Sequence, residues 1–422
     1  MNPATPSQAA APPAHAAEKY EATVMFTIGF AFLPVAVLAP VQIWVLALAG
    51  TIAIMGLRLW HRAPVLPLWS PLAILFAVLI SWGAVTWFWT IAPERTVYTS
   101  LRLVLVAISL VVLIDAASAL NQHNRRRFDI WLITGTGVGL LLTAAMMLTN
   151  GEFASWIGMH LQRGHELDRL NRTGGVIAIL VWPVALVIAH MFGRWVAAAV
   201  IALAALAVFA LAPSTPILAF ISGAAAFSVA WISPVWGKRL LLVAFAVSVV
   251  VIPFQDQIVP LARDFLIANI DAPNSEVHRF VIWQFASEQI MNRPLFGWGL
   301  DTSRAIPGAE QQLFLFQLGE EKATTGQALP LHPHNALIQI WLELGVIGML
   351  IAGMLFILVV TSIPSVPGNR AGPAILIAAI ASAFAIAQLS FGIWQGWWLS
   401  TLGLFAVIVV AAAPNDRPAR PV

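Results

Sequence analysis

Residues 331–335 read Leu331-His332-Pro333-His334-Asn335, and an apolar run, residues 336–348, follows directly. Two imidazoles and an amide therefore stand at the start of a long hydrophobic segment. Most of the chain on either side is also strongly apolar. A pair of titratable side chains placed where water meets lipid is the first candidate for chemistry in this protein.

The composition is that of a polytopic membrane protein. Of the 422 residues, 60% are hydrophobic and 10% are charged, whereas soluble domains carry about 25% charge. The absence of cysteine excludes disulfides, thiolate metal sites and cysteine nucleophiles. Many of the 18 tryptophans stand near expected span ends, where indole rings act as interfacial anchors. These are Trp60, Trp69, Trp87, Trp89, Trp394, Trp397 and Trp398.

Helix length sets the number of spans. A hydrocarbon core of about 30 Å needs roughly 20 apolar residues per helix. The sequence therefore predicts an all-α protein with about twelve transmembrane helices. We expect them near residues 24–39, 41–57, 71–91, 102–120, 128–149, 173–192, 195–211, 216–234, 240–254, 336–360, 372–392 and 396–413. This divides the chain into a disordered tail (1–22), nine helices (23–254), a large loop (255–335), three helices (336–413) and a second tail (414–422).

The basic residues indicate orientation rather than nucleic-acid binding, because they are scattered among short loops. With the N-terminus inside, the inner side carries 12 basic and 5 acidic residues, and the outer side carries 10 basic and 14 acidic residues. We therefore expect both termini in the cytoplasm. The polar stretches 92–101, 150–172 and 255–335 then lie outside.

The outer loop 255–335 is longer than a connector requires, and such loops are usually functional or disordered. Residues 275–292 mix apolar and charged side chains in the pattern of an amphipathic helix. Pro294 should end this helix, and Gly297-Trp298-Gly299 should form a turn. We expect short helices in this loop rather than disorder.

His334 is the strongest candidate for a catalytic residue. A histidine at a helix start often only caps the helix and faces water, and His332 fits that ordinary role better. At His334, however, the neighbouring Asn335 could orient an imidazole, and Pro333 stiffens the approach. We therefore assign His334 a functional role, with Asn335 and His332 as orienting residues.

Outer-face arginines are the candidates for binding phosphate, because guanidinium groups can hold phosphate oxygens bidentately. Arg172 and Arg279 stand where a lipid headgroup would lie, and Arg163 and Arg169 are intermediate candidates. For Arg263, Arg293 and Arg304 we favour ordinary loop charge. Glu166 and Asp168 could hold a divalent cation, but the surrounding arginines argue against it, so no metal is expected. No P-loop, Rossmann turn or zinc-spaced set occurs, and no cofactor is expected.

Two blocks give the sequence a resemblance to a known family. The first runs from Arg279-Phe280-Val281-Ile282-Trp283 to Pro294-Leu295-Phe296-Gly297-Trp298-Gly299. The second is His334-Asn335, nine residues, then Gly345-Val346-Ile347-Gly348. In their order and spacing these resemble the O-antigen ligase family (WaaL-type), with which protein O-oligosaccharyltransferases and Wzy-type polymerases share the second block.

The resemblance implies a membrane glycosyltransferase of the GT-C-like class in the bacterial inner membrane, with its active site on the periplasmic face. Its donor would be an undecaprenyl-pyrophosphate-linked polysaccharide and its acceptor lipid A–core. Arg172 and Arg279 match the family's essential arginines by placement, and neither ATP nor metal is implied. His334 would act as general base in a single, inverting displacement.

Three other functions stay open on the sequence. A polymerase or a protein O-oligosaccharyltransferase would use the same donor with a different acceptor. A transporter of lipid-linked oligosaccharide is the alternative of another class. The spans are nearly free of charge, whereas transporters usually carry ionisable residues mid-span. This favours an enzyme.

Overall fold

The computed structural model describes residues 14–66, 70–156, 166–211, 214–269, 274–317, 323–364 and 370–412, without the side chains of 14–17, 166–170 and 274. The first half contains α1 (Ala14–Leu38), η1 (Pro40–Gln42), α2 (Ile43–Trp60), α3 (Pro71–Val85), η2 (Thr86–Phe88), α4 (Pro93–Ala119), α5 (Gln122–Leu148), α6 (Glu152–Trp156), α7 (Glu166–Phe192) and α8 (Arg194–Ala210). The second contains α9 (Ser214–Ile232), α10 (Pro234–Val251), η3 (Ile252–Phe254), α11 (Gln255–Asn269), α12 (Asn274–Asn292), η4 (Ser303–Ala305), β1 (Gln312–Phe316), β2 (Thr324–Gln327), α13 (Ala336–Ser362), α14 (Ala371–Leu389) and α15 (Gly396–Ala412).

Ten helical segments in the described ranges are long and apolar enough to cross a membrane. The expected spans 195–211 and 396–413 correspond to α8 and α15, which are apolar but have only 17 residues each. The prediction of about twelve spans is therefore confirmed for ten. Two boundaries also differ: α1 begins at Ala14 within the expected tail, and α10 continues through η3 into α11 as one apolar segment of 36 residues.

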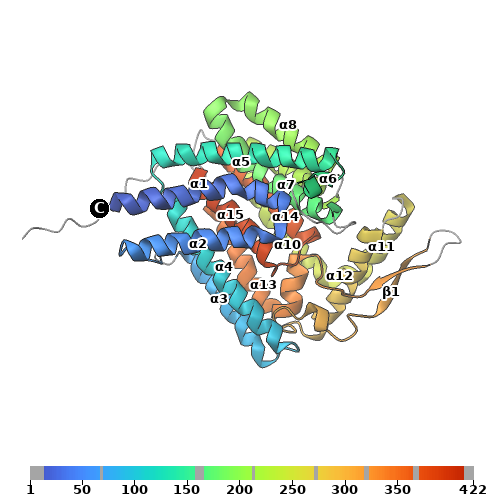
Figure 1. The fold of residues 1–422 in the computed structure, drawn as a ribbon. Helices are drawn as coiled ribbons and strands as arrows, with labels where there is room; N and C mark the ends of the chain where they lie inside the picture. The colour runs from blue at the N-terminus through green and yellow to red at the C-terminus, as the bar shows by residue number, and fades with distance from the viewer. Residues whose placement is uncertain are drawn as a thin grey trace, which may run out of the picture.

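The predicted all-α architecture is confirmed in the described ranges, and the loop 255–335 adds one small two-stranded hairpin to its helices. Its helix α12 ends at Asn292, close to the predicted limit, but β1 and β2 then form an antiparallel pair with Gln312 opposite Gln327. β1 reads Gln-Leu-Phe-Leu-Phe, a short apolar run with two phenylalanines, and aromatic residues favour strands. Its residues Leu315 and Phe316 pack against Val277 and Val281 of α12. Figure 1 shows α11, α12 and β1 together at one side of the helix bundle.

Residues predicted to lie on opposite sides of the membrane make polar contacts at opposite ends of the helices. On the side assigned as inner, Arg58 Nη2 lies 2.9 Å from Glu21 Oε2 and 3.0 Å from Asp115 Oδ2. On the other side, the loop 255–335 meets the start of α4, where Thr96 Oγ1 donates to the carbonyl of Leu300 at 3.0 Å. The fold therefore brings distant outer stretches to one place, where the candidate site lies.

Candidate active site

Asn335 begins α13 as its N-cap residue. Its Oδ1 accepts hydrogen bonds from the backbone N–H groups of Leu337 and Ile338, both at 3.0 Å. These donors have no partner inside the helix, so a side-chain oxygen stabilises the first turn. The acceptor oxygen of Asn335 is thus used by the backbone, and its role in orienting an imidazole stays a prediction.

A break in α13 explains both glycine motifs. Gly345 has φ 68° and Gly297 also has φ 68°, a region that favours glycine. A Cβ added to Gly345 would lie 2.1 Å from the carbonyl oxygen of Leu295, and one at Gly297 would lie 2.4 Å from that of Glu343. Neither approach is compatible with a side chain. The two sequence blocks that carried the resemblance therefore meet backbone to backbone.

Three carbonyls just before this break accept hydrogen bonds from other segments. The N–H of Trp298 donates to Leu342 O and the N–H of Gly299 donates to Glu343 O, each at 2.9 Å. The indole N–H of Trp82 donates to Leu344 O at 2.9 Å. Unpaired backbone groups would destabilise a membrane-embedded helix, and these bonds remove that cost. The break is a fixed joint between α13 and residues 294–299.

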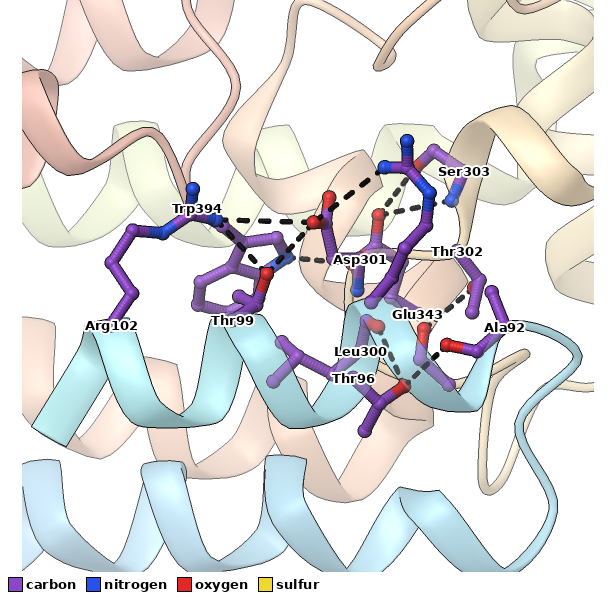
Figure 2. Close-up of polar contacts among 12 residues, drawn as sticks. Ala92, Thr96, Thr99, Arg102, Leu300, Asp301, Thr302, Ser303, Glu343 and Trp394 are labelled. Atoms are coloured by element: carbon purple, nitrogen blue, oxygen red, sulfur yellow. Dashed lines mark hydrogen bonds and ion pairs between the residues drawn. The ribbon is translucent and has the colours of Figure 1, made fainter.

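Glu343 lies two residues before Gly345 and is fully buried. Its carboxylate accepts hydrogen bonds from three segments of the chain. Its carboxylate accepts from the backbone N–H of Asp301 at 2.5 Å, from the Trp394 indole at 2.6 Å and from Gln339 Nε2 at 3.1 Å. The hydroxyl of Ser303 also donates to it. Figure 2 shows Glu343 between Trp394, Asp301 and Ser303. A buried carboxylate is tolerated where its oxygens are hydrogen-bonded in this way.

The segment 390–397, called here the 390–397 strap, connects this carboxylate to the histidines. Gln339 Oε1 accepts from the backbone N–H of Ile393 at 2.9 Å, and Trp394 is held by Glu343. At its start, the strap presents the Ser390 carbonyl 2.6 Å from His334 Nδ1. Further along, Gln395 Nε2 lies 3.2 Å from His332 Nε2. Glu343 therefore fixes the strap that contacts both imidazoles.

The Ser390 contact determines the form of the His334 ring. A carbonyl only accepts, so the proton of neutral His334 lies on Nδ1 and the lone pair on Nε2. The ring of His332 lies 4.3 Å away between centroids, and its Nδ1 accepts from the His334 backbone N–H at 3.1 Å. His334 itself has φ 55°. His332 is thus buried and orients the backbone of His334, rather than facing water as a simple cap.

Both histidines are held neutral by their surroundings. Burial, together with His334 and Arg304, lowers the pKa of His332 to about 3. Burial also lowers the pKa of His334, the Ser390 bond opposes that effect, and the charges of Arg279 and His278 add to the lowering. An unprotonated His334 at neutral pH can accept a proton at Nε2.

Arg279 lies near His334 through α12. Four residues further on the same helix face, the Trp283 indole N–H donates to the carbonyl of Pro333 at 2.8 Å. Burial lowers the pKa of Arg279, yet a guanidinium remains charged. Within the described ranges, Arg279 has neither a hydrogen bond nor an ion pair. Glu276 is the nearby acidic charge that acts on it, yet no acidic side chain pairs with this half-buried guanidinium in the described chain, so it is a candidate anion-binding group.

Arg172 approaches the strap from α7. Its guanidinium lies 5.7 Å from the ring centroid of Trp397, whose indole N–H donates to Gln395 Oε1 at 2.9 Å. Arg163 and the side chain of Arg169 lie outside the described residues. The same holds for the side chains of Glu166 and Asp168. Elsewhere in the described chain, no three acidic or imidazole groups gather as metal ligands.

Sequence reasoning missed the strap. Trp394, Trp397 and Trp398 were expected as interfacial anchors, yet they are 3%, 7% and 0% exposed. The correction has a physical cause, since the Trp394 and Trp397 indoles donate to a carboxylate and an amide inside the protein. The available signal was Glu343, a lone acid in an apolar run, which requires buried donors.

Comparison with known proteins gives a family match for part of the chain. Residues 199–353 match the family described as "Wzy_C: O-Antigen ligase". This stretch of the chain is similar to the O-antigen ligase family. The matched part of this Wzy_C domain contains α12, the 294–299 joint and the His334 end of α13, and the resemblance inferred from the two blocks is confirmed.

Distant relatives agree with the Wzy_C match. A Rickettsia conorii protein named "Putative polysaccharide ligase RC0486" is 26% identical over 292 residues, which cover 68% of this chain and 67% of that protein. A Rickettsia felis protein with the name "Putative polysaccharide ligase" is 25% identical over 332 residues, or 78% and 77%. No solved structure gave a significant match. The chain is thus similar to ligases of polysaccharides and is a multi-pass membrane protein by its ten apolar helices.

Proposed function

We propose that the protein is an O-antigen ligase, which transfers an undecaprenyl-pyrophosphate-linked polysaccharide to lipid A–core on the periplasmic face of the bacterial inner membrane. The observation that carries this proposal is the pairing of a neutral, oriented imidazole at His334 with the unpaired cation of Arg279. A base and an anion-binding group side by side suit transfer from a pyrophosphate-linked donor. The Wzy_C match supports the reaction class.

In the proposed reaction, His334 Nε2 takes the proton from an acceptor sugar hydroxyl. The hydroxyl oxygen forms a bond to the anomeric carbon as the bond from that carbon to the pyrophosphate oxygen breaks. Undecaprenyl pyrophosphate leaves, and Arg279 with Arg172 stabilises its negative charge. General-base assistance contributes typically about 10²–10⁴-fold, and charge stabilisation contributes comparably. One base without a second nucleophile corresponds to inversion at the anomeric carbon.

The broken helix does not favour transport. Discontinuous spans in transporters leave backbone groups free to coordinate ions or substrate. Here the carbonyls of Leu342, Glu343 and Leu344 accept from Trp298, Gly299 and Trp82. The joint at Gly345 therefore serves to support the site, not to coordinate cargo.

The decisive experiment supplies one donor and three acceptors to the purified full-length protein in proteoliposomes. The acceptors are lipid A–core, a pilin-like protein and free lipid-linked repeat units. We expect a covalent product with lipid A–core alone, formed equally with and without a chelator. Product on the protein or on repeat units would replace the ligase proposal by an oligosaccharyltransferase or a polymerase, and movement of donor across the membrane without product would indicate a transporter.

A further inference from the structure

A second cationic group lies at the start of α4, away from His334. Arg95, Thr99 and Arg102 are spaced by four and three residues, which places them on one helix face. They surround Asp301: Thr99 Oγ1 donates to its Oδ2 at 2.8 Å, and Arg95 Nη1 and Arg102 Nη2 lie 3.8 and 3.9 Å from the same oxygen. Figure 2 shows Arg102 and Thr99 of α4 directed at Asp301. One carboxylate thus stands against two guanidinium groups.

The two guanidinium groups retain most of their hydrogen-bond donors. Separations of 3.8 and 3.9 Å are ion pairs, but they are too long for hydrogen bonds. Within the described chain, Arg95 makes no hydrogen bond, and Arg102 donates only to Thr99 at 3.0 Å. Arg102 Nε is buried without a partner. Buried unpaired donors are rare in folded proteins and indicate a missing ligand group.

An apolar cavity is lined by the same two segments of the chain. It has a volume of about 580 Å³ and is lined by Trp89 and residues 293–297. Trp89 stands six residues before Arg95, and Gly297 four residues before Asp301. The Trp89 indole nitrogen is buried without a partner, and Arg293, whose guanidinium lies over the Trp298 ring, adds a third positive charge to the cavity wall. Cations beside an aromatic, apolar cavity fit an amphipathic ligand with a phosphate and acyl chains.

We propose that Arg95, Arg102 and the cavity at Trp89 bind the phosphorylated glycolipid acceptor, with its phosphate at the arginines and apolar chains in the cavity. This inference rests on the proposed function, since it takes lipid A–core as acceptor. The strap supports the proposal by its position. It begins at Ser390, whose carbonyl contacts His334, and near its end a Cβ at Gly396 would contact Arg102 Cδ. Six extended residues span at most about 20 Å, so donor and acceptor phosphates would bind within reach of each other.

The test measures lipid binding to the purified full-length protein and does not depend on turnover. Three probes separate the sources of the phosphate: lipid A with its phosphates, dephosphorylated lipid A, and phosphatidylglycerol. We expect the phosphorylated lipid A to bind about tenfold or more tightly than the other two, as for one charge-assisted contact group. Arg95→Gln should abolish this difference, since the Arg95 side chain is 36% exposed and has no hydrogen bond to lose in folding.

Matched variants sharpen the result. Arg263→Gln removes an exposed arginine that is paired with Asp264 on α11 and should leave all three affinities unchanged. Phe296→Ala should weaken both forms of lipid A alike, because it alters the cavity and not the cations. Equal binding of phosphatidylglycerol, or a phosphate preference that survives Arg95→Gln, would overturn the proposal.

In the ligation assay, Arg95→Gln should raise KM for the acceptor and leave KM for the donor unchanged. Absence of ligation by the wild type would count against the proposed function. The lipid-binding measurement would still decide whether this site binds the phosphorylated lipid.

Discussion

The arginine pair Arg95 and Arg102 differs from Arg279 in how its charge is balanced. Arg95 and Arg102 share the carboxylate of Asp301 and are about one-third exposed. Arg279 makes no ion pair in the described chain, with Glu276 as a nearby acidic charge, and it lies near an imidazole that burial keeps neutral. An enclosed cation without a partner is costly, so its energy is recovered when an anion binds. The comparison assigns the chemical step to Arg279 and His334, and a supporting role in substrate affinity to Arg95 and Arg102.

The largest effect is expected for His334→Ala. Removal of the proposed base should lower ligation by at least about 10²-fold, the lower range of general-base assistance. Ligated product per unit of membrane-inserted protein is the measurement, with exposed His190→Ala as the matched control. Near-normal ligation by the His334 variant would show that His334 is not the general base. The assignment of the chemical step to Arg279 and His334 would then be wrong.

Arg279→Lys should follow, with a decrease in kcat of about tenfold. Lysine keeps the positive charge but cannot hold a pyrophosphate bidentately, and its ammonium is more strongly hydrated. The loss should fall on kcat, whereas Arg95→Gln should change only KM for the acceptor. Arg263→Lys provides the control on an exposed ion pair. If Arg279→Lys keeps the full kcat, the bidentate contact is absent from the transition state.

Glu343→Gln should have a smaller effect on activity, and it should also reduce stability. The glutamine amide turns one acceptor oxygen into a donor that faces the N–H of Asp301 or the indole of Trp394. Buried unsatisfied donors cost about 1–3 kcal/mol each. Thermal unfolding in detergent should show a lower Tm than for exposed Glu310→Gln. An unchanged Tm would show that Glu343 does not hold the strap.

The sequence predicted the residues of the site better than their connections. The apolar run and the histidine pair placed α13 and His334, and helical periodicity placed α12, because both signals are local. The contact of residues 294–299 with the break at Gly345 could not be predicted, since glycine spacing suggests close packing but names no partner. The strap was misread for a similar reason: an indole at a span end looks the same in sequence whether its N–H meets water or a buried carboxylate. The pairing of Arg95 and Arg102 with Asp301, 199 residues beyond Arg102, arises only through the fold and could not be read from the sequence.

The pH dependence of kcat distinguishes a buried, neutral His334 from a solvent-exposed histidine. It is the smallest of the expected changes. A free histidine has a pKa near 6.5, so a solvent-exposed base would lose half of the activity at that pH. Burial lowers the pKa of His334, so kcat should fall less between pH 7.5 and 6.5 than it would with such an exposed base. An acid limb centred at or above pH 6.5 would show that the ring is solvated and that its environment differs from the one at Ser390.

Thermal stability should also decrease as the pH falls below 6.5. His332 has a folded-state pKa of about 3, below its unfolded value near 6.5, so the unfolded chain binds a proton first and the folded state loses stability between those two pH values. The His332→Gln variant removes this group and should flatten the decrease in Tm between pH 6.5 and 4. Because His332 orients the His334 backbone without touching substrate in the proposed reaction, the same variant should retain an acid limb of activity below pH 6.5. If His332→Gln removed both the acid limb of activity and the decrease in Tm, the proton taken up below pH 6.5 would belong to His332. The two imidazoles would then titrate together, and His334 would not act as a separate base.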